Sequence, residues 1–138
     1  MVSTRRSTVS TTGQGDVHDV TSAVVAAVAE SRLRAGIVTV FVVGSTAGIT
    51  TLEFEPGVIG DLGRALEVVA PRDGKYEHHL RWHDDNGSSH VRAALIGPSV
   101  TIPFVDGQLM LGTWQQVALI ELDTRGRRRE VVMQVIGE

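Results

Sequence analysis

The sequence predicts a single α+β domain over residues 1–138, with antiparallel or mixed β-sheets and two to three helices. Three observations support this fold class. First, 138 residues and 14.8 kDa are typical of one domain. Second, β-branched runs and helical periodicities follow one another without a repeated βαβ unit. Third, Asp106-Gly107 joins two alternating runs, which is a strong hairpin signal.

The first third of the chain predicts an edge strand, a helix and a buried strand. Residues 2–12 are rich in Ser, Thr and Val, which favour a strand, with disorder as the alternative. Thr21 is a candidate N-cap for a helix of about a dozen residues that ends at Gly36. Its core face comprises Val20, Val24, Val28 and Leu33. Residues 37–43 are too short and too β-branched for another helix.

In the middle of the chain, residues 49–55 predict a strand that places Glu53 and Glu55 on one face. Apolar residues at helical spacing follow over 58–69, until Pro71 ends the helix. Residues 76–83 are expected to be extended or irregular. A short helix then begins at Ser88 or Ser89 and ends at Gly97-Pro98.

The C-terminal third predicts strands only. Residues 100–105 and 108–111 flank the Asp106-Gly107 turn. Residues 114–123 and 127–136 form another expected pair across the turn at 124–126. Together these strands predict an antiparallel meander.

Composition excludes several classes of function. A formal charge of -3 and a pI near 5.9 provide no general attraction to nucleic acid or to an anionic membrane. The absence of cysteine excludes disulfides and thiolate metal sites. The start of the chain has no apolar signal region, and the apolar run 37–43 is too short to span a bilayer. We therefore expect a cytoplasmic protein with no nucleic-acid or membrane partner.

Histidine clustering is the main compositional oddity, since four of the five histidines lie within residues 78–90. Zinc or another divalent ion is bound by imidazole nitrogens and carboxylate oxygens. These ligands are available here from His79, His83 and His90, with Asp84 or Asp85. Their spacing matches no standard metal motif, and surface histidines are the alternative.

Three further groups are candidates for binding. The carboxylates of Glu53 and Glu55 either face solvent or bind a cation. The segment 44–48, Gly-Ser-Thr-Ala-Gly, forms either a nest for an anion or a tight connection. The arginines at 127–129 form a charged edge strand, or one of them reaches inward to a phosphate.

Several blocks of the sequence together resemble the YjbQ-like family, whose members are described as secondary thiamine-phosphate synthases. Residues 105–116, which read Val-Asp-Gly-Gln-Leu-Met-Leu-Gly-Thr-Trp-Gln-Gln, are similar to the signature of that family. The resemblance extends in order through 44–51, Glu53 and Glu55, 76–79, 86–90 and 127–129. It therefore covers nearly the whole chain after the first strand.

The resemblance implies a homotrimer with a polar pocket near a subunit boundary. It also implies a reaction in which hydroxymethylpyrimidine diphosphate and a thiazole phosphate are joined and diphosphate is released. Such a reaction usually uses Mg²⁺ and donors to phosphate oxygens. The competing hypotheses are a metal-dependent hydrolase and a non-catalytic trimer that binds a small anion.

The family blocks, with the chemistry of their side chains, select the candidate site. The predicted catalytic residues are Glu55, His79 and His90, which are also the predicted ligands of a divalent metal, Mg or Zn. The predicted binders of a phosphorylated small molecule are Ser45, Thr46, Asn86, Trp114 and Arg128. Trp114 is expected in or beside an interface or pocket. Many relatives carry histidine where this chain has Ser45, which weakens any mechanism that needs a base there.

Overall fold

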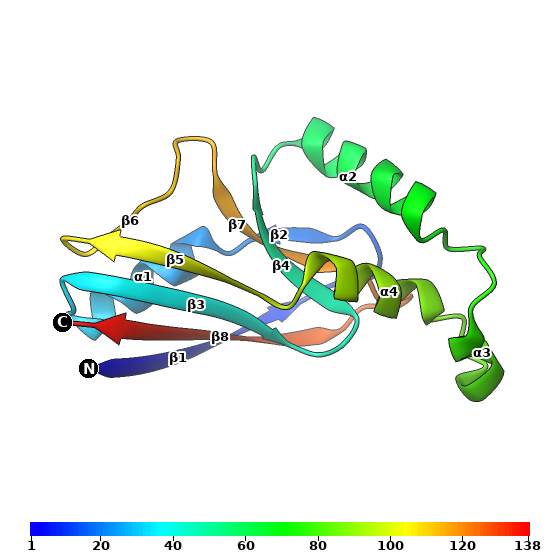
Figure 1. Ribbon diagram of the computed structural model, residues 1–138, viewed down its shortest axis with the longest axis horizontal. Helices are drawn as coiled ribbons and strands as arrows, with labels where there is room; N and C mark the ends of the chain where they lie inside the picture. Colours follow the sequence, from blue (N-terminus) through cyan, green and yellow to red (C-terminus); the bar gives the residue numbers. More distant parts are fainter.

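Two antiparallel sheets lie face to face in the computed structural model, which describes all residues 1–138, and four helices accompany them (Figure 1). The strands are β1 (Val2–Ser10), β2 (Val17–Asp19), β3 (Ala35–Val43), β4 (Ala47–Leu52), β5 (Ser99–Val105), β6 (Gln108–Leu109), β7 (Gln116–Glu121) and β8 (Arg128–Gly137). The helices are α1 (Thr21–Ser31), α2 (Pro56–Val69), α3 (Glu77–Trp82) and α4 (Gly87–Ile96). The predicted α+β class is confirmed, although four helices form rather than two to three.

The strand order corrects the predicted C-terminal meander. The larger sheet has the order β1-β8-β3-β5-β6, and the smaller sheet has the order β2-β7-β4. The β5–β6 hairpin forms as predicted, with positive φ at Asp106 (51°) and Gly107 (73°). The predicted pairing of β7 with β8 is wrong, because β2 and β4 flank β7 while β1 and β3 flank β8. The turn at 124–126 therefore leads from one sheet to the other.

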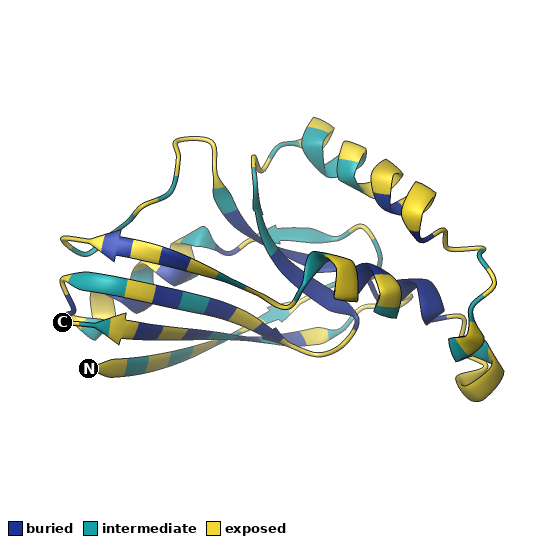
Figure 2. Cartoon of the chain, viewed as in Figure 1, coloured by how far each residue is buried: buried dark blue, intermediate teal, exposed yellow.

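The main core lies between the sheets and against α1. Alternate residues of β3 and β8 point into it, including Val38, Val40, Val131 and Met133. The predicted core face of α1, Val20, Val24, Val28 and Leu33, is buried as expected. Figure 2 shows the corresponding alternation of buried and exposed residues along β3 and β8.

Strand β7 is buried on both faces, because a second, smaller cluster lies on its other side. There Ile120 and Leu122 pack with Leu66 of α2 and Ala93 of α4. Helices α2 and α4 thus cover the smaller sheet on the side away from the main core. This double burial explains why β7 shows no polar and apolar alternation in the sequence.

Three predicted boundaries differ from those in the structure. Helix α1 ends at Ser31, followed by Arg32 at φ 60°, and not at Gly36. Gly36 lies within β3, where a Cβ would stand 2.0 Å from the carbonyl oxygen of Ile136. Strand β4 ends at Leu52, so Glu53 and Glu55 do not share the face of a strand.

The fourth difference is helix α3, which occupies most of the segment that was expected to be extended. It has only six residues, begins after Tyr76 and ends where His83 adopts φ 52°. So short a helix shows too little periodicity to be recognised in a sequence. None of the helices is long and apolar enough to cross a membrane.

The outer face of the larger sheet is uncovered and carries large apolar side chains. They are Ile37, Phe41 and Val43 of β3, Val105 of β5 and Ile136 of β8. Residues at alternate positions of paired strands share a face, so these five lie on one surface. We call this surface the apolar sheet face.

Candidate functional site

A polar cleft of about 430 Å³ lies where the β3–β4 turn, the α3–α4 segment and the β7–β8 connection meet. These parts are far apart in the sequence, and the fold brings them to one end of the two sheets (Figure 1). The lining residues are Gly44, Ser45, Thr46, His78, Trp82, Asp84, Asn86, His90, Asp123, Arg127 and Arg129.

A buried ion pair forms the base of this cleft. Arg129 belongs to the core face of β8, the face that also carries Val131 and Met133. Its Nη2 donates to Oε1 of Glu121 at 2.5 Å, and its Nε donates to Oε2 at 2.8 Å. Thr11 donates to the same Oε2 at 2.5 Å. Burial raises the pKa of Glu121, but hydrogen bonds from Arg129 and Thr11 outweigh this effect and leave it below its usual value.

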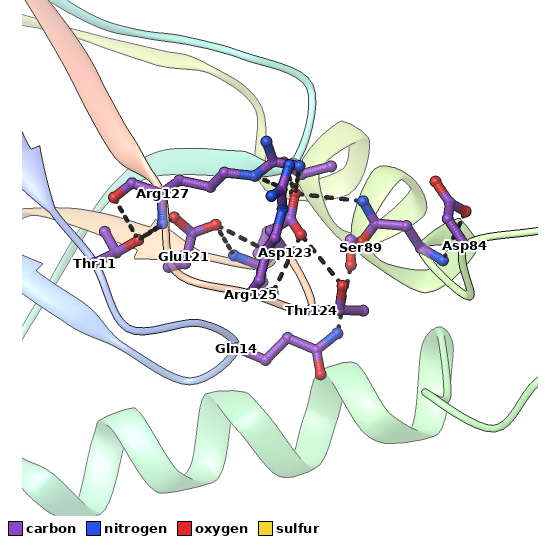
Figure 3. A network of polar contacts seen from close by, with 12 residues as sticks. Thr11, Gln14, Asp84, Ser89, Glu121, Asp123, Thr124, Arg125 and Arg127 are labelled. Carbon is purple, nitrogen blue, oxygen red and sulfur yellow. Dashed lines mark hydrogen bonds and ion pairs between the residues drawn. The ribbon is translucent and has the colours of Figure 1, made fainter. Parts of the chain in front are cut away.

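A second carboxylate, Asp123, continues the network toward the cleft. Thr46 links the two carboxylate sites, because its hydroxyl accepts from Nη2 of Arg129 at 2.7 Å and donates to Oδ2 of Asp123 at 2.9 Å. The same Oδ2 accepts from Nδ2 of Asn86 at 3.3 Å and from Nε of Arg127 at 3.0 Å. Figure 3 shows Asp123 at the centre of these contacts, with Arg127 and Glu121 beside it.

The pKa of Asp123 reflects this environment. Burial raises the pKa of its carboxyl group, but hydrogen bonds from Thr46 and Asn86 and the charge of Arg127 lower it to about 2. Asp123 is only 1% exposed and stays ionised at neutral pH. It can therefore hold Arg127 and Asn86 in fixed positions.

Both arginines keep donors that the protein does not use. Nε and Nη2 of Arg129 bond to Glu121 and Thr46, while its Nη1 has no hydrogen-bond partner in the chain. Arg127 uses Nε and Nη2 on Asp123, and its Nη1 is likewise unbonded. Gly44, at φ 138°, leaves room here, because a Cβ would stand 2.8 Å from Nη1 of Arg129. Two oriented guanidinium groups thus offer free N–H groups beside a small-residue turn.

Two histidines and an amide complete the cleft. The rings of His78 and His90 are in contact, with centroids 4.4 Å apart. Nδ1 of His78 lies 3.4 Å from Oδ1 of Asp84, without the geometry of a hydrogen bond. Oδ1 of Asn86 is buried and has no partner. The cleft therefore offers guanidinium donors to an oxyanion, and imidazoles that can donate or accept a hydrogen bond.

Four of the predicted site residues line this cleft, namely Ser45, Thr46, Asn86 and His90. Four others do not, which corrects the predicted convergence within one chain. His79 lines a different cavity, where its Nδ1 is 3.2 Å from Oδ1 of Asp85. Trp114 is 73% exposed on the loop before β7 and lines no cavity.

The other two corrections are Glu55 and Arg128. Glu55 is the N-cap of α2, where its carboxylate accepts from the backbone N–H groups of Gly57, at 2.9 Å, and Val58. That role satisfies orphan donors at the start of a helix. Arg128 is exposed on the face of β8 opposite to that of Arg129.

The predicted metal ligands do not form a site in this chain. His79, His90 and Glu55 lie in three different environments. No group of three His, Asp or Glu side chains is arranged to hold a metal ion. Asp123 and Glu121, the most buried carboxylates of the site, already bind arginines. The residues of one chain therefore form no ready site for a Mg or Zn ion, and the metal stays a prediction.

Comparison with known proteins places the chain in a family. The sequence model of the family described as "UPF0047 protein YjbQ-like" matches residues 5–138. The chain belongs to this YjbQ-like family. A UPF0047 protein of Methanothermobacter thermautotrophicus is 37% identical over 123 residues, which cover 89% of this chain and 84% of that protein. The UPF0047 protein YugU of Bacillus subtilis is 29% identical over 130 residues, 94% of this chain and 96% of that protein.

Solved structures agree with this assignment. A YbjQ-like protein of unknown function from Sulfolobus solfataricus P2 superposes with a TM-score of 0.89 at 28% identity, over 100% of both chains. A hypothetical protein from Aeropyrum pernix K1 gives a TM-score of 0.89 at 32% identity, over 99% of both chains. The YjbQ-like fold is thus shared over the full length of the chain.

The predicted site omitted seven residues that line the YjbQ-like cleft, among them His78, Asp123, Arg127 and Arg129. One signal was available for Arg129, because it alternates in phase with the apolar Val131, Met133 and Val135. Asp123 gave no such signal, since it follows a strand without alternation. His78 was not among the predicted residues, since an extended segment would turn it away from His79.

The lowered pKa of Asp123 predicts a specific loss of stability in acid. A carboxylate with a folded-state pKa of about 2, against a usual 3.8, stabilises the fold above pH 4, and this contribution disappears as pH falls to about 2. The unfolding free energy of the wild type should fall between about pH 4 and pH 2. In Asp123→Asn, which has no carboxyl group to protonate, this fall should be smaller by about 2 kcal/mol. Urea denaturation across this range measures the difference. An equal acid loss in both proteins would contradict the assignment.

Proposed function

We propose that the polar cleft binds the phosphate or diphosphate group of a small phosphorylated molecule. One observation carries this proposal. Arg127 and Arg129 both line the cleft, each is held by a buried carboxylate, and each keeps an Nη1 without a hydrogen-bond partner in the chain. Guanidinium donors that are already oriented lose little freedom when they bind phosphate oxygens.

The charges around the cleft are nearly balanced, so oriented donors rather than net charge support the proposal. Asp123 and Glu121 neutralise the two arginines, so these arginines alone add no net charge. The remaining donors come from His78 and His90 and from the start of α4, whose positive dipole end lies directly after Asn86. Asp84 adds one carboxylate to the lining, so a bound phosphate depends on these donors and on the two guanidinium groups.

Diphosphate binding tests the site with a closely matched control. We expect Arg127→Gln to weaken diphosphate binding by about ten- to a hundredfold, because it removes a charge-assisted hydrogen bond. Arg128→Gln removes the same charge one residue away, on the opposite face of β8, and should change affinity by less than about twofold. Calorimetric titration at neutral pH and low salt makes the measurement, with thermal melting as the check on folding. Equal losses in both variants would disprove the proposal.

The family resemblance supports a more specific reaction, which is the thiamine-phosphate synthase type of transfer. In this step the thiazole nitrogen attacks the exocyclic carbon of hydroxymethylpyrimidine diphosphate. A carbon–nitrogen bond forms, the carbon–oxygen bond breaks, and diphosphate leaves with the electron pair. Arg127 and Arg129 would stabilise the charge that develops on the leaving group, and His90 would donate a proton to it.

A synthase assay with purified protein tests this reaction and separates it from the alternatives. We expect thiamine phosphate to form, Arg127→Gln and His90→Ala to lower its formation at least about tenfold, and Arg128→Gln to leave it unchanged. The assay is run with and without Mg²⁺, because a metal requirement stays a prediction. Diphosphate binding without turnover would identify a non-catalytic anion-binding protein. Release of diphosphate without the thiazole substrate would identify a hydrolase.

We also propose that the chain forms a homotrimer through the apolar sheet face. Several large apolar side chains are exposed on this face, among polar residues such as Thr39 and Gln134, and closed symmetric assembly would cover them. The number of subunits rests on the family resemblance.

Light scattering tests the assembly. The wild type should have a mass about three times 14.8 kDa at micromolar concentration. Phe41→Asp places a charge in the centre of the apolar sheet face and should shift the mass toward one chain. Val68→Asp, on the 84% exposed Val68 of α2, serves as the control and should keep the mass of the wild type. A wild-type mass near 14.8 kDa would contradict the proposal.

A further inference from the structure

A second cavity, of about 410 Å³, lies on the other side of the α3–α4 segment. It shares no lining residue with the polar cleft. Its lining includes charged, aromatic and aliphatic side chains, among them Arg72, Lys75, Tyr76, His79, Leu80 and Asp85. Consecutive histidines face the two sites, since His78 lines the cleft and His79 lines this cavity.

Tyr76 forms a fixed wall of the second cavity. Its hydroxyl donates to the carbonyl oxygen of Pro71 at 2.6 Å, which closes the turn before α3. Two glycines lie so close to Tyr76 that neither position has room for a side chain. A Cβ on Gly87 would stand 2.4 Å from the Cβ of Tyr76, and one on Gly74 would stand 2.9 Å from its Cε2. A tyrosine held in this way offers a rigid apolar surface beside an open space.

Leu80 extends this apolar surface. Leu80 is 75% exposed on α3. Covering a large aliphatic side chain of this kind with an apolar group is favourable, because it removes apolar surface from water. Tyr76 and Leu80 together therefore suit the apolar part of a small organic ligand.

Two cations and two carboxylates line the cavity, and Lys75 is the cation that no carboxylate holds. Lys75 is the only lysine in the chain, where all other basic residues except histidine are arginine, and its ammonium has no ion-pair partner. Arg72 is 3.8 Å from Glu67 through Nε. Asp85 lies 3.2 Å from His79. Glu77, in the first turn of α3, is the remaining carboxylate at the cavity.

We infer that this cavity is a second binding site, for an organic anion with an aromatic or aliphatic body. The anionic group would bind Lys75 and Arg72, and the apolar body would lie on Tyr76 and Leu80. This inference does not depend on the function proposed for the polar cleft, because the two sites have no lining residue in common.

The single lysine provides a direct reporter for the test. Reductive methylation with ¹³C-formaldehyde labels Lys75 and the α-amino group, keeps both charges, and gives a Lys75 signal that Lys75→Arg identifies. Phenyl phosphate is titrated as the probe, with inorganic phosphate and phenol as its two halves. We expect phenyl phosphate to shift the Lys75 signal with an affinity about tenfold or more above that of inorganic phosphate. Equal affinities, or no shift, would overturn the inference.

Variants then assign the contacts. Arg72→Gln should weaken the phenyl phosphate affinity about tenfold. Leu80→Ser, at an exposed position that folding tolerates, should reduce it toward that of inorganic phosphate. Arg64→Gln on α2 removes an exposed arginine outside the cavity and should have no effect. Loss of the Lys75 shift in Arg127→Gln would show that the probe occupies the polar cleft and would overturn the inference. Its retention would support two separate sites.

Discussion

The buried ion pair of Arg129 and Glu121 is the constraint on which the rest of the site depends. Arg129 comes from β8, an inner strand of the larger sheet, and Glu121 ends β7 of the smaller sheet. Their two hydrogen bonds therefore fix one end of each sheet to the other. Thr11, which follows β1, and Thr46, which precedes β4, bond to the same pair. Loss of one partner would leave a buried charge, at a cost of about 3–5 kcal/mol.

Such a pair is weak evidence for stability, because the desolvation of both charges opposes their attraction. Its clearer consequence is orientation. Thr46 transmits the position of Arg129 to Asp123, and Asp123 in turn fixes Arg127 and Asn86. Nε and Nη2 of both arginines, the Thr46 hydroxyl and Nδ2 of Asn86 all bond within this network. Nη1 of each arginine remains without a partner in the chain, and a guanidinium group held in this way has little freedom left to lose on binding a ligand.

The sequence predicted the local elements better than their partners. The core face of α1 and the Asp106-Gly107 turn follow from periodicity and from backbone preference, which are local properties. The partner of β8 is not local, since the turn at 124–126 resembles a hairpin whether or not its two strands pair. Glu55 shows the same limit. Its alternation with Glu53 indicated a strand, but Pro56 begins a helix that the Glu55 carboxylate caps.

The histidine segment shows how one local error displaces a whole site. In an extended chain His79, Arg81 and His83 would share a face, and His78 would point away from them. In helix α3 each residue turns by about 100° from the one before, so that His78 contacts His90 while His79 contacts Asp85. The same six-residue helix thus supplies one histidine to each cavity. Its short length hides it in the sequence, yet it determines which imidazole lies beside the two arginines.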